Sequence, residues 1–180
     1  MKGWHSWNSD GVNFATAAGE TADESLFLTL NGRQQLPRRQ LKLRLVVDER
    51  GILPVGDFAH TGLQVPRVLS QRAWATLADV LEATGTTASA RIAGVEAPYI
   101  VWWPSVVADC LDANRSEVYE SFSGFRRLVR PAFRQDAVPA VPFVLKGFES
   151  QEVWVDDETR RRIESSELLG AEFRHTVSAN

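Results

Sequence analysis

Cysteine is almost absent from this sequence: Cys110 is the only one among 180 residues. One thiol cannot close a disulfide within the chain and cannot build a structural zinc site. The lack of a disulfide framework fits a reducing compartment. Cys110 could act as a nucleophile paired with His60. It lies beside an apolar stretch, however, where a buried and inert thiol is the commoner arrangement, and we expect that arrangement here.

Long apolar runs and ligand-binding motifs are also missing. No window approaches the roughly 20 apolar residues of a membrane-spanning helix, and the start of the chain lacks the apolar run of a signal peptide. We therefore expect a cytoplasmic protein with no membrane partner. Glycine-rich phosphate-binding motifs and a G-x-S-x-G element are absent, and the three histidines are widely separated. The sequence predicts no cofactor, no metal ion and no catalytic residues.

An excess of basic charge is lacking too. Lys and Arg total 20 against 23 Asp and Glu, so no strong field for a polyanion is expected. One group of basic residues could still contact phosphates, and it keeps weak binding to nucleic acid open as an alternative. Its members are Lys42, Arg44, Arg126, Arg127, Arg130 and Arg134. Aromatic residues are not interleaved with them in a stacking pattern, so we expect no nucleic-acid partner.

What the sequence does contain is a repeated pattern of strand, polar cap, helix and glycine. Residues 99–103 are apolar on both faces, which is typical of a strand inside a sheet, and Pro104 ends that strand. Ser70 is a good N-cap for one helix, and the acidic residues 156–158 cap another. We predict an α+β fold with mixed, largely antiparallel sheets, few helices and two similar α/β halves.

The predicted domain organisation has two parts. Residues 1–25 are rich in small and polar residues, so we expect a loosely structured N-terminal arm. Its two tryptophans, Trp4 and Trp7, either fill the core or contact a partner. Residues 26–180 are expected to form a single domain, with sub-lobes at 26–97 and 98–180.

Three local patterns indicate further strands. Residues 26–30 are predicted as a strand, and 41–47 alternate between apolar and basic residues as a half-buried strand does. Residues 118–122 and 125–129 flank Ser123-Gly124, which predicts a hairpin with a basic second strand.

Two carboxylates follow the strand at 99–103. Asp109 and Asp112 are three positions apart, which on one helical face is the minimum for an acid–base or Mg²⁺ pair. The rival interpretation is that Asp112 and Ser116 bind nearby backbone N–H groups and fix a turn. We favour the turn, because no further carboxylate or basic motif completes a site. An enzyme that uses an Asp109/Asp112 site remains an alternative.

Several segments, in order and spacing, resemble immunity protein family eleven of bacterial polymorphic toxin systems. The resemblance covers about residues 54–175. It rests on Leu53-Pro54 with Asp57-Phe58, on V-L-S-Q-R-A-W-A-T-L from Val68, on Tyr99 to Ser116, on V-W-V-D-D-E-T-R-R-R-I from Val153, and on L-L-G-A-E-F from Leu168. Two positions depart from the family pattern: Asp156 stands where serine is common, and Leu169 where threonine is. The first 40 residues match nothing in the family.

The resemblance implies a function in toxin neutralisation. Members of this family are thought to bind a toxin encoded beside them and to protect the producing cell. For this chain the resemblance implies a cytoplasmic, non-enzymatic inhibitor that acts by direct contact with its cognate toxin, and it leaves the oligomeric state open. Acidic and aromatic residues could plug a basic cleft in the toxin. The candidate toxin-binding residues are Trp102, Trp103, Asp109, Asp112 and Glu117.

Overall fold

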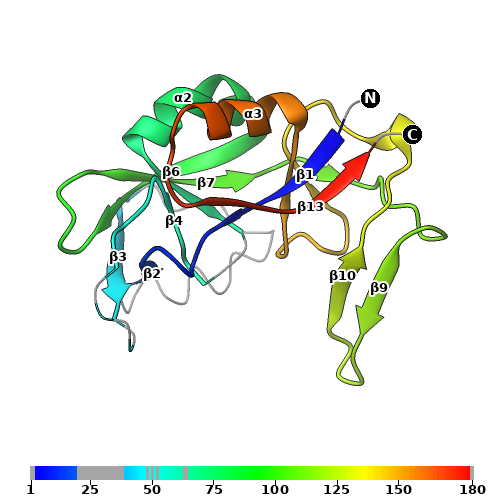
Figure 1. Ribbon diagram of the computed structural model, residues 1–180, viewed down its shortest axis with the longest axis horizontal. Coiled ribbons are helices and arrows are strands. Elements are labelled where there is room, and N and C mark those ends of the chain that lie inside the picture. Colours follow the sequence, from blue (N-terminus) through cyan, green and yellow to red (C-terminus); the bar gives the residue numbers. More distant parts are fainter. Residues whose placement is uncertain are drawn as a thin grey trace.

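The strands of the computed structural model fall into two sheets and one separate hairpin (Figure 1). The structure describes residues 3–19, 39–47, 49, 51, 53–62 and 65–178. The strand predicted at 26–30 lies outside them. The described part contains two α-helices and two 3-10 turns, which are α2 (Gln71–Leu81), α3 (Asp157–Ser165), η1 (Glu82–Thr84) and η2 (Gln135–Ala137). Most strand pairs are antiparallel, so the predicted α+β class with mixed sheets and few helices is confirmed.

The first sheet has six strands and curls until its two edges meet. Its strands, in spatial order, are β2 (Thr16–Gly19), β3 (Leu41–Val46), β6 (Gly85–Ile92), β7 (Tyr99–Pro104), β5 (Arg67–Ser70) and β4 (Phe58–Ala59). Thr16 pairs with His60, next to β4, and the Ala17 N–H donates to the His60 carbonyl at 2.6 Å. A core that includes Ala17, Leu43 and Val101 fills the curl.

The second sheet has five strands, and its central strands come from opposite ends of the sequence. In spatial order they are β13 (Ala171–Ser178), β1 (Gly3–Ser9), β12 (Val153–Asp156), β11 (Phe143–Leu145) and β8 (Val107–Ala108). The hairpin consists of β9 (Glu117–Glu120) and β10 (Arg126–Arg130), and it projects away from the rest of the molecule (Figure 1).

The same local arrangement occurs in both sheets. In the first, β5 and β6 lie on either side of β7, both antiparallel to it, and α2 with η1 connects them. In the second, β12 and β13 flank β1 in the same way, and α3 connects them. The predicted caps hold both helices, because Ser70 Oγ accepts from the Ala73 N–H at 3.1 Å and Asp156 Oδ1 from the Thr159 N–H at 3.0 Å. The predicted pattern of strand, polar cap and helix therefore occurs in both sheets.

The prediction of a loose N-terminal arm is wrong for the described residues of that segment. Residues 3–9 form β1, which is hydrogen-bonded on both sides, and 16–19 form β2. Trp4 and Trp7 are buried, so core filling was the correct alternative for both. The polar residues of β1 are buried as well, which hid the strand from an analysis of apolar periodicity.

The predicted sub-lobe boundary is also misplaced. Residues 99–104 form β7, which lies between β6 and β5 in the first sheet, so the boundary at 97/98 cuts through that sheet. Residues 3–9 belong with the second sheet, although the prediction left them out of the domain.

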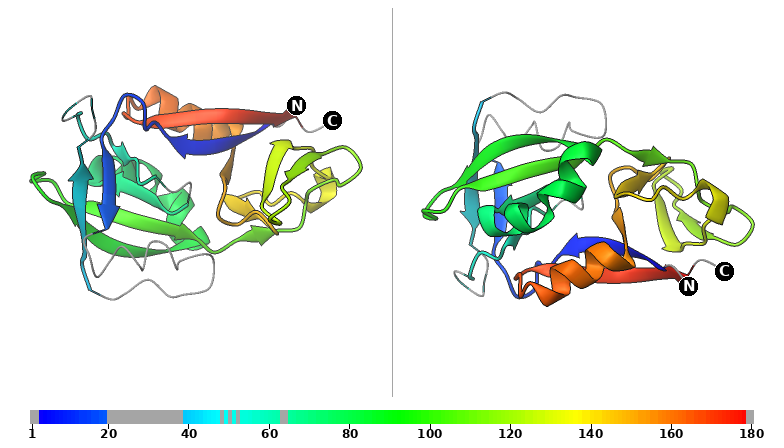
Figure 2. Two further views of the ribbon diagram at one scale, coloured as in Figure 1. Left: turned by 90° about the horizontal axis from the view of Figure 1, so that it is seen from below. Right: turned by 90° about the horizontal axis from the view of Figure 1, so that it is seen from above.

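One core joins the two sheets. Trp7 of β1 lies edge-on to Phe58, with ring centroids 5.2 Å apart, and stacks on Trp102 at 6.4 Å. The buried faces of α2 and α3 close this core through Leu77 and Ile163. The two helices lie side by side (Figures 1 and 2), and Arg162 of α3 binds Asp79 of α2 at 2.8 Å. Neither helix of the described chain is long and apolar enough to cross a bilayer.

Candidate partner-binding surface

The hairpin β9–β10 follows from its local sequence, as predicted. Ser121 closes the turn: its N–H donates to the Phe125 carbonyl at 2.8 Å, and its hydroxyl accepts from the Phe125 N–H at 3.0 Å. Gly124 has φ of +78°, which glycine adopts without steric cost. The predicted turn at Ser123-Gly124 and the basic second strand are therefore confirmed.

One side of the hairpin is anchored to the body. The Gln151 side chain runs beside β10: its Nε2 donates to the Arg126 carbonyl at 2.6 Å, and its Oε1 accepts from the Leu128 N–H at 3.3 Å. Leu128 is buried in the core beneath the second sheet, and Arg126 lies over the Phe148 ring at 5.2 Å. These contacts fix the root of the hairpin and leave its tip to solvent.

The tip carries exposed aromatic side chains. Phe122 is fully exposed, and Phe125 and Tyr119 expose 58% and 53% of their surface. Three arginines, Arg126, Arg127 and Arg130, accompany them on β10. Large aromatic side chains gain nothing for folding at such positions, whereas aromatic and arginine residues are enriched where proteins meet. The sequence predicts the hairpin but not this surface, because Phe122 lies within a predicted strand and its exposure follows only from the turn geometry.

Trp102 is not a surface residue, and its prediction as a toxin contact is wrong. Its indole is fully buried in the shared core, and Nε1 donates to the Leu81 carbonyl at the end of α2, 2.9 Å away. Trp103, the next residue, is half-buried and packs against the same core. The double apolar pattern of 99–103 correctly indicated burial on both faces, and that burial is what removes Trp102 from any docking surface.

The three acidic candidates lie between the end of β8 and the first residue of β9 but do not form one site. Asp109 is exposed and pairs with Lys146 at 2.9 Å and with Arg134 at 3.5 Å; the hydrogen bond from Lys146 lowers its pKa. Asp112 fixes a turn, because its Oδ1 accepts from the Asn114 N–H at 3.0 Å. The favoured interpretation of Asp112 is therefore confirmed. Glu117 begins β9 and is exposed, 3.9 Å from Arg130.

Cys110 is buried, as expected. Burial raises the pKa of its thiol to about 11, so it stays protonated at neutral pH and is a poor nucleophile. Among the described residues, no three His, Cys, Asp or Glu side chains converge to hold a metal ion.

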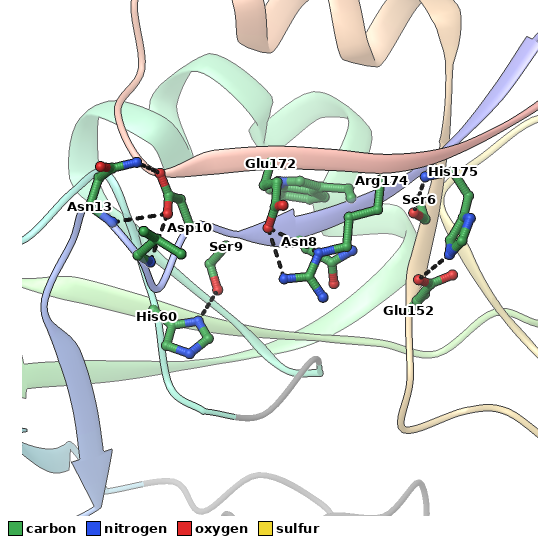
Figure 3. A network of polar contacts seen from close by, with 12 residues as sticks. Ser6, Asn8, Ser9, Asp10, Asn13, His60, Glu152, Glu172, Arg174 and His175 are labelled. Carbon is green, nitrogen blue, oxygen red and sulfur yellow. Dashed lines mark hydrogen bonds and ion pairs between the residues drawn. The ribbon is translucent and has the colours of Figure 1, made fainter. Parts of the chain in front are cut away.

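A polar network covers the face of the second sheet next to the hairpin root (Figure 3). Glu152 and His175 face each other there, with Oε1 and Nε2 3.5 Å apart, and Arg174 binds Glu172 at 2.9 Å. Burial raises the pKa of Glu152, against the opposing effects of His175 and Arg67. A hollow of about 290 Å³ opens beside the network, and its lining includes Arg127 of the hairpin. Glu152 directly precedes β12 and His175 lies on β13, and because β1 inserts between these two strands, no spacing in the sequence could have indicated their contact.

A buried guanidinium lies behind this network. Arg67 donates from Nη2 to the Trp7 carbonyl and to Asn8 Oδ1, 3.4 Å away, while its Nε and Nη1 find no acceptor among the described residues. Burial lowers the pKa of Arg67 to about 9, so it is still charged at neutral pH. The buried charge costs stability, and Glu152 offsets part of that cost.

A second polar chain joins the strands from the two ends of the sequence. Asp157 Oδ1 lies 2.8 Å from His5 Nε2, and His5 Nδ1 lies 3.0 Å from Thr176 Oγ1. Carboxylate, imidazole and hydroxyl in this order resemble a nucleophile triad. Arg160 Nη1, which can only donate, lies 3.1 Å from the same Nδ1. The lone pair of His5 Nδ1 therefore already accepts from Arg160 and is not available to take a proton from the Thr176 hydroxyl. The arrangement instead holds β1, β13 and α3 together.

The group of basic residues that could contact phosphates lies on two different parts of the fold. Lys42 and Arg44 project from β3, whereas the other four arginines lie on β10 or just after it. Three of those four pair with acidic side chains: Arg126 with Glu120, Arg130 with Glu117 and Arg134 with Asp109. The basic charge is thus divided and largely compensated.

Comparison with known proteins gives no family assignment. No protein-family model matches this chain, and no curated protein matches it significantly.

Proposed function

We propose that this protein is an immunity protein, which binds a cognate bacterial toxin in the cytoplasm of the producing cell and neutralises it by direct contact. The observation that carries the proposal is the projecting β9–β10 hairpin with Tyr119, Phe122 and Phe125 exposed. Neutralisation by contact needs a surface of about 800 Å² from each partner and no catalytic group. The resemblance of about residues 54–175 to immunity protein family eleven supports the same function.

The hairpin is suited to docking for a physical reason. Its root is fixed by Gln151 and Leu128, so little conformational entropy is lost there when the tip is covered. Its tip combines apolar rings with arginines, which are the residue types that dominate binding energy in protein interfaces. Arg127 forms no ion pair with the described residues and is free to contact a carboxylate of the toxin.

Cell rescue tests this function. The protein is co-expressed with the toxin encoded beside it, and survival and the dissociation constant of the complex are measured. We expect the wild type to protect, and Phe122→Ser with Phe125→Ser to weaken binding by about 1,000-fold, because two aromatic anchors of about 2 kcal/mol each are lost. Leu169→Ser, at an exposed apolar side chain far from the hairpin, is the matched control and should protect fully. Failure of the wild type to protect would refute the function.

Two other functions have weaker support. An enzyme built on Asp109 and Asp112 would need both carboxylates at one site, whereas Asp109 is ion-paired and Asp112 fixes a turn. Binding to nucleic acid would require an excess of positive charge on the hairpin, and Glu120 and Glu117 lie beside two of its three arginines. Salt-dependent retention on heparin at low ionic strength would favour binding to nucleic acid over the proposed immunity function.

A further inference from the structure

The outer strand of the hairpin has an unpaired edge. Glu120 stands opposite Arg126, Tyr119 opposite Arg127 and Val118 opposite Leu128. Along an antiparallel pair of strands, two kinds of opposite residue pair alternate. In one kind, the two residues exchange main-chain hydrogen bonds. In the other kind, both residues turn their main-chain groups outward, away from the neighbouring strand. The main-chain groups of Arg126 and Leu128 point away from β9, because Gln151 binds them. The N–H and C=O groups of Val118 and Glu120 must therefore point outward from β9.

No described residue satisfies these outward groups. Outside the β9–β10 ladder, the main chains of Val118 and Glu120 make no hydrogen bond to the described part of the chain. Figure 1 shows β9 on the side of the hairpin away from the body, with β10 between them. Gln151 already covers the free edge of β10, so β9 is the edge of this hairpin that can accept another strand.

The side chains along β9 define the partner strand. Glu117 and Glu120 expose about 60% of their side chains and lie 3.9 and 3.6 Å from their arginines, longer than a charge-assisted hydrogen bond. Tyr119 is exposed and Val118 half-buried. Residues directly opposite each other in paired strands interact, with opposite charges favourable and like charges unfavourable. A complementary strand therefore carries basic residues opposite the two glutamates and apolar residues between them.

We propose that an extended basic segment of the toxin adds to the hairpin as a third strand along β9, with the pattern basic–apolar–apolar–basic. This rests on the proposed function and specifies how the partner binds. Main-chain hydrogen bonds to Val118 and Glu120 supply affinity, and Glu117 and Glu120 supply specificity. A second copy of this chain is a poor occupant, because β9 carries no basic residue that could stand opposite Glu117 or Glu120 when two β9 strands pair.

Hydrogen exchange with defined peptides tests strand addition. The probes are Ac-Thr-Lys-Val-Val-Lys-Thr-NH₂ and its counterpart with glutamate in place of lysine, each titrated into the full chain and followed by NMR. We expect the basic peptide to bind at least about 10-fold more tightly than the acidic one, and to slow exchange of the Val118 and Glu120 amides by about 10-fold or more. The amides of Tyr119 and Arg127, which face each other inside the hairpin, serve as controls and should change little.

Two substitutions at one position separate charge from hydrogen bonding. Glu120→Gln removes the charge alone, and we expect it to weaken binding of the basic peptide about 3-fold. Glu120→Pro also removes the outward N–H, which an edge strand tolerates because that N–H takes no part in the hairpin ladder. It should weaken binding at least about 5-fold further, while the β10 amide shifts confirm that the hairpin is intact.

Several results would overturn the proposal. Equal affinity for the two peptides, no detectable binding, or binding without protection of Val118 and Glu120 would each exclude strand addition by a basic segment. A dimer that Glu120→Pro abolishes would place a second copy of the chain on the edge instead. In cell rescue, equal protection by Glu120→Pro and Glu120→Gln would refute strand addition and leave the immunity function standing. Loss of protection by the wild type would refute the immunity function itself.

Discussion

Trp102 illustrates how a residue predicted for binding is instead required for stability. Its indole fills the core that the two sheets share and donates to the last turn of α2. We expect Trp102→Ala to lower the free energy of unfolding by about 3–5 kcal/mol, because it opens a large cavity and removes the indole N–H from the Leu81 carbonyl, which still accepts from the Thr84 hydroxyl at 3.1 Å. Trp103→Ala, at the half-buried neighbour, should cost clearly less. Urea unfolding measures both, and an equally stable Trp102→Ala variant that had lost toxin protection would contradict this assignment.

Asp57 lies at the junction of β4, α2 and the loop before β13. Its carboxylate makes the free energy of unfolding depend on pH. Burial alone would raise its pKa, but hydrogen bonds from Arg72, the Leu169 N–H and Ser70 outweigh burial and lower it. The lowered pKa means that the stabilisation is complete above the unfolded-state pKa of about 4 and is lost as pH falls through the folded-state value. We expect Asp57→Asn to cost about 2 kcal/mol at pH 7, and the difference from the wild type to shrink below pH 4. A constant difference from pH 7 to pH 3, in urea titrations, would contradict this.

At the level of elements, the hairpin depends on one side chain from outside itself. Gln151 takes the place of a third strand along β10, with two hydrogen bonds worth about 1 kcal/mol each. Gln151→Ala should therefore speed exchange of the Leu128 amide by about 10-fold and leave amides in β7 unchanged. Glu149→Ala is the control, because it removes a hydrogen bond to Gly147 in the same loop without touching the hairpin. Unchanged protection of Leu128 would show that the hairpin holds its geometry alone.

The sequence predicted best the elements that are determined by residues only a few positions apart. Ser70 and Asp156 each cap a helix by binding the N–H of the residue three positions later. Gly124 lies in the turn that residues 121–125 close. The polar face of the second sheet could not be predicted in this way. Ser6 and Asn8 are polar yet buried, and Glu152 meets His175 only because β1 pairs with β12 and β13. Exposure at the hairpin tip was equally hidden, since apolar residues such as Phe122 indicate a core unless the turn is known.

At the scale of the whole molecule, the two sheets should unfold as one unit. β1 lies between β13 and β12 in the second sheet, and Trp7 on it packs against Phe58 and Trp102 of the first. Deleting residues 1–10 removes the strand between β12 and β13, so we expect a chain with little stable structure. Dispersion of NMR amide signals measures this, with deletion of residues 1–2 as the control. A well-dispersed spectrum from the larger deletion would show that the first sheet folds independently.

The position of β1 also governs when the protein can begin to act in a cell. His5 and the Asp157 carboxylate that binds it are 152 positions apart, so a ribosome must make nearly all of the strands before β1 finds its neighbours. All strands of the first sheet are made earlier, but Trp7, which belongs to the core that the two sheets share, is not held in place until β12 and β13 have been made. For the immunity function proposed above, protection can therefore begin only after β13 has been made.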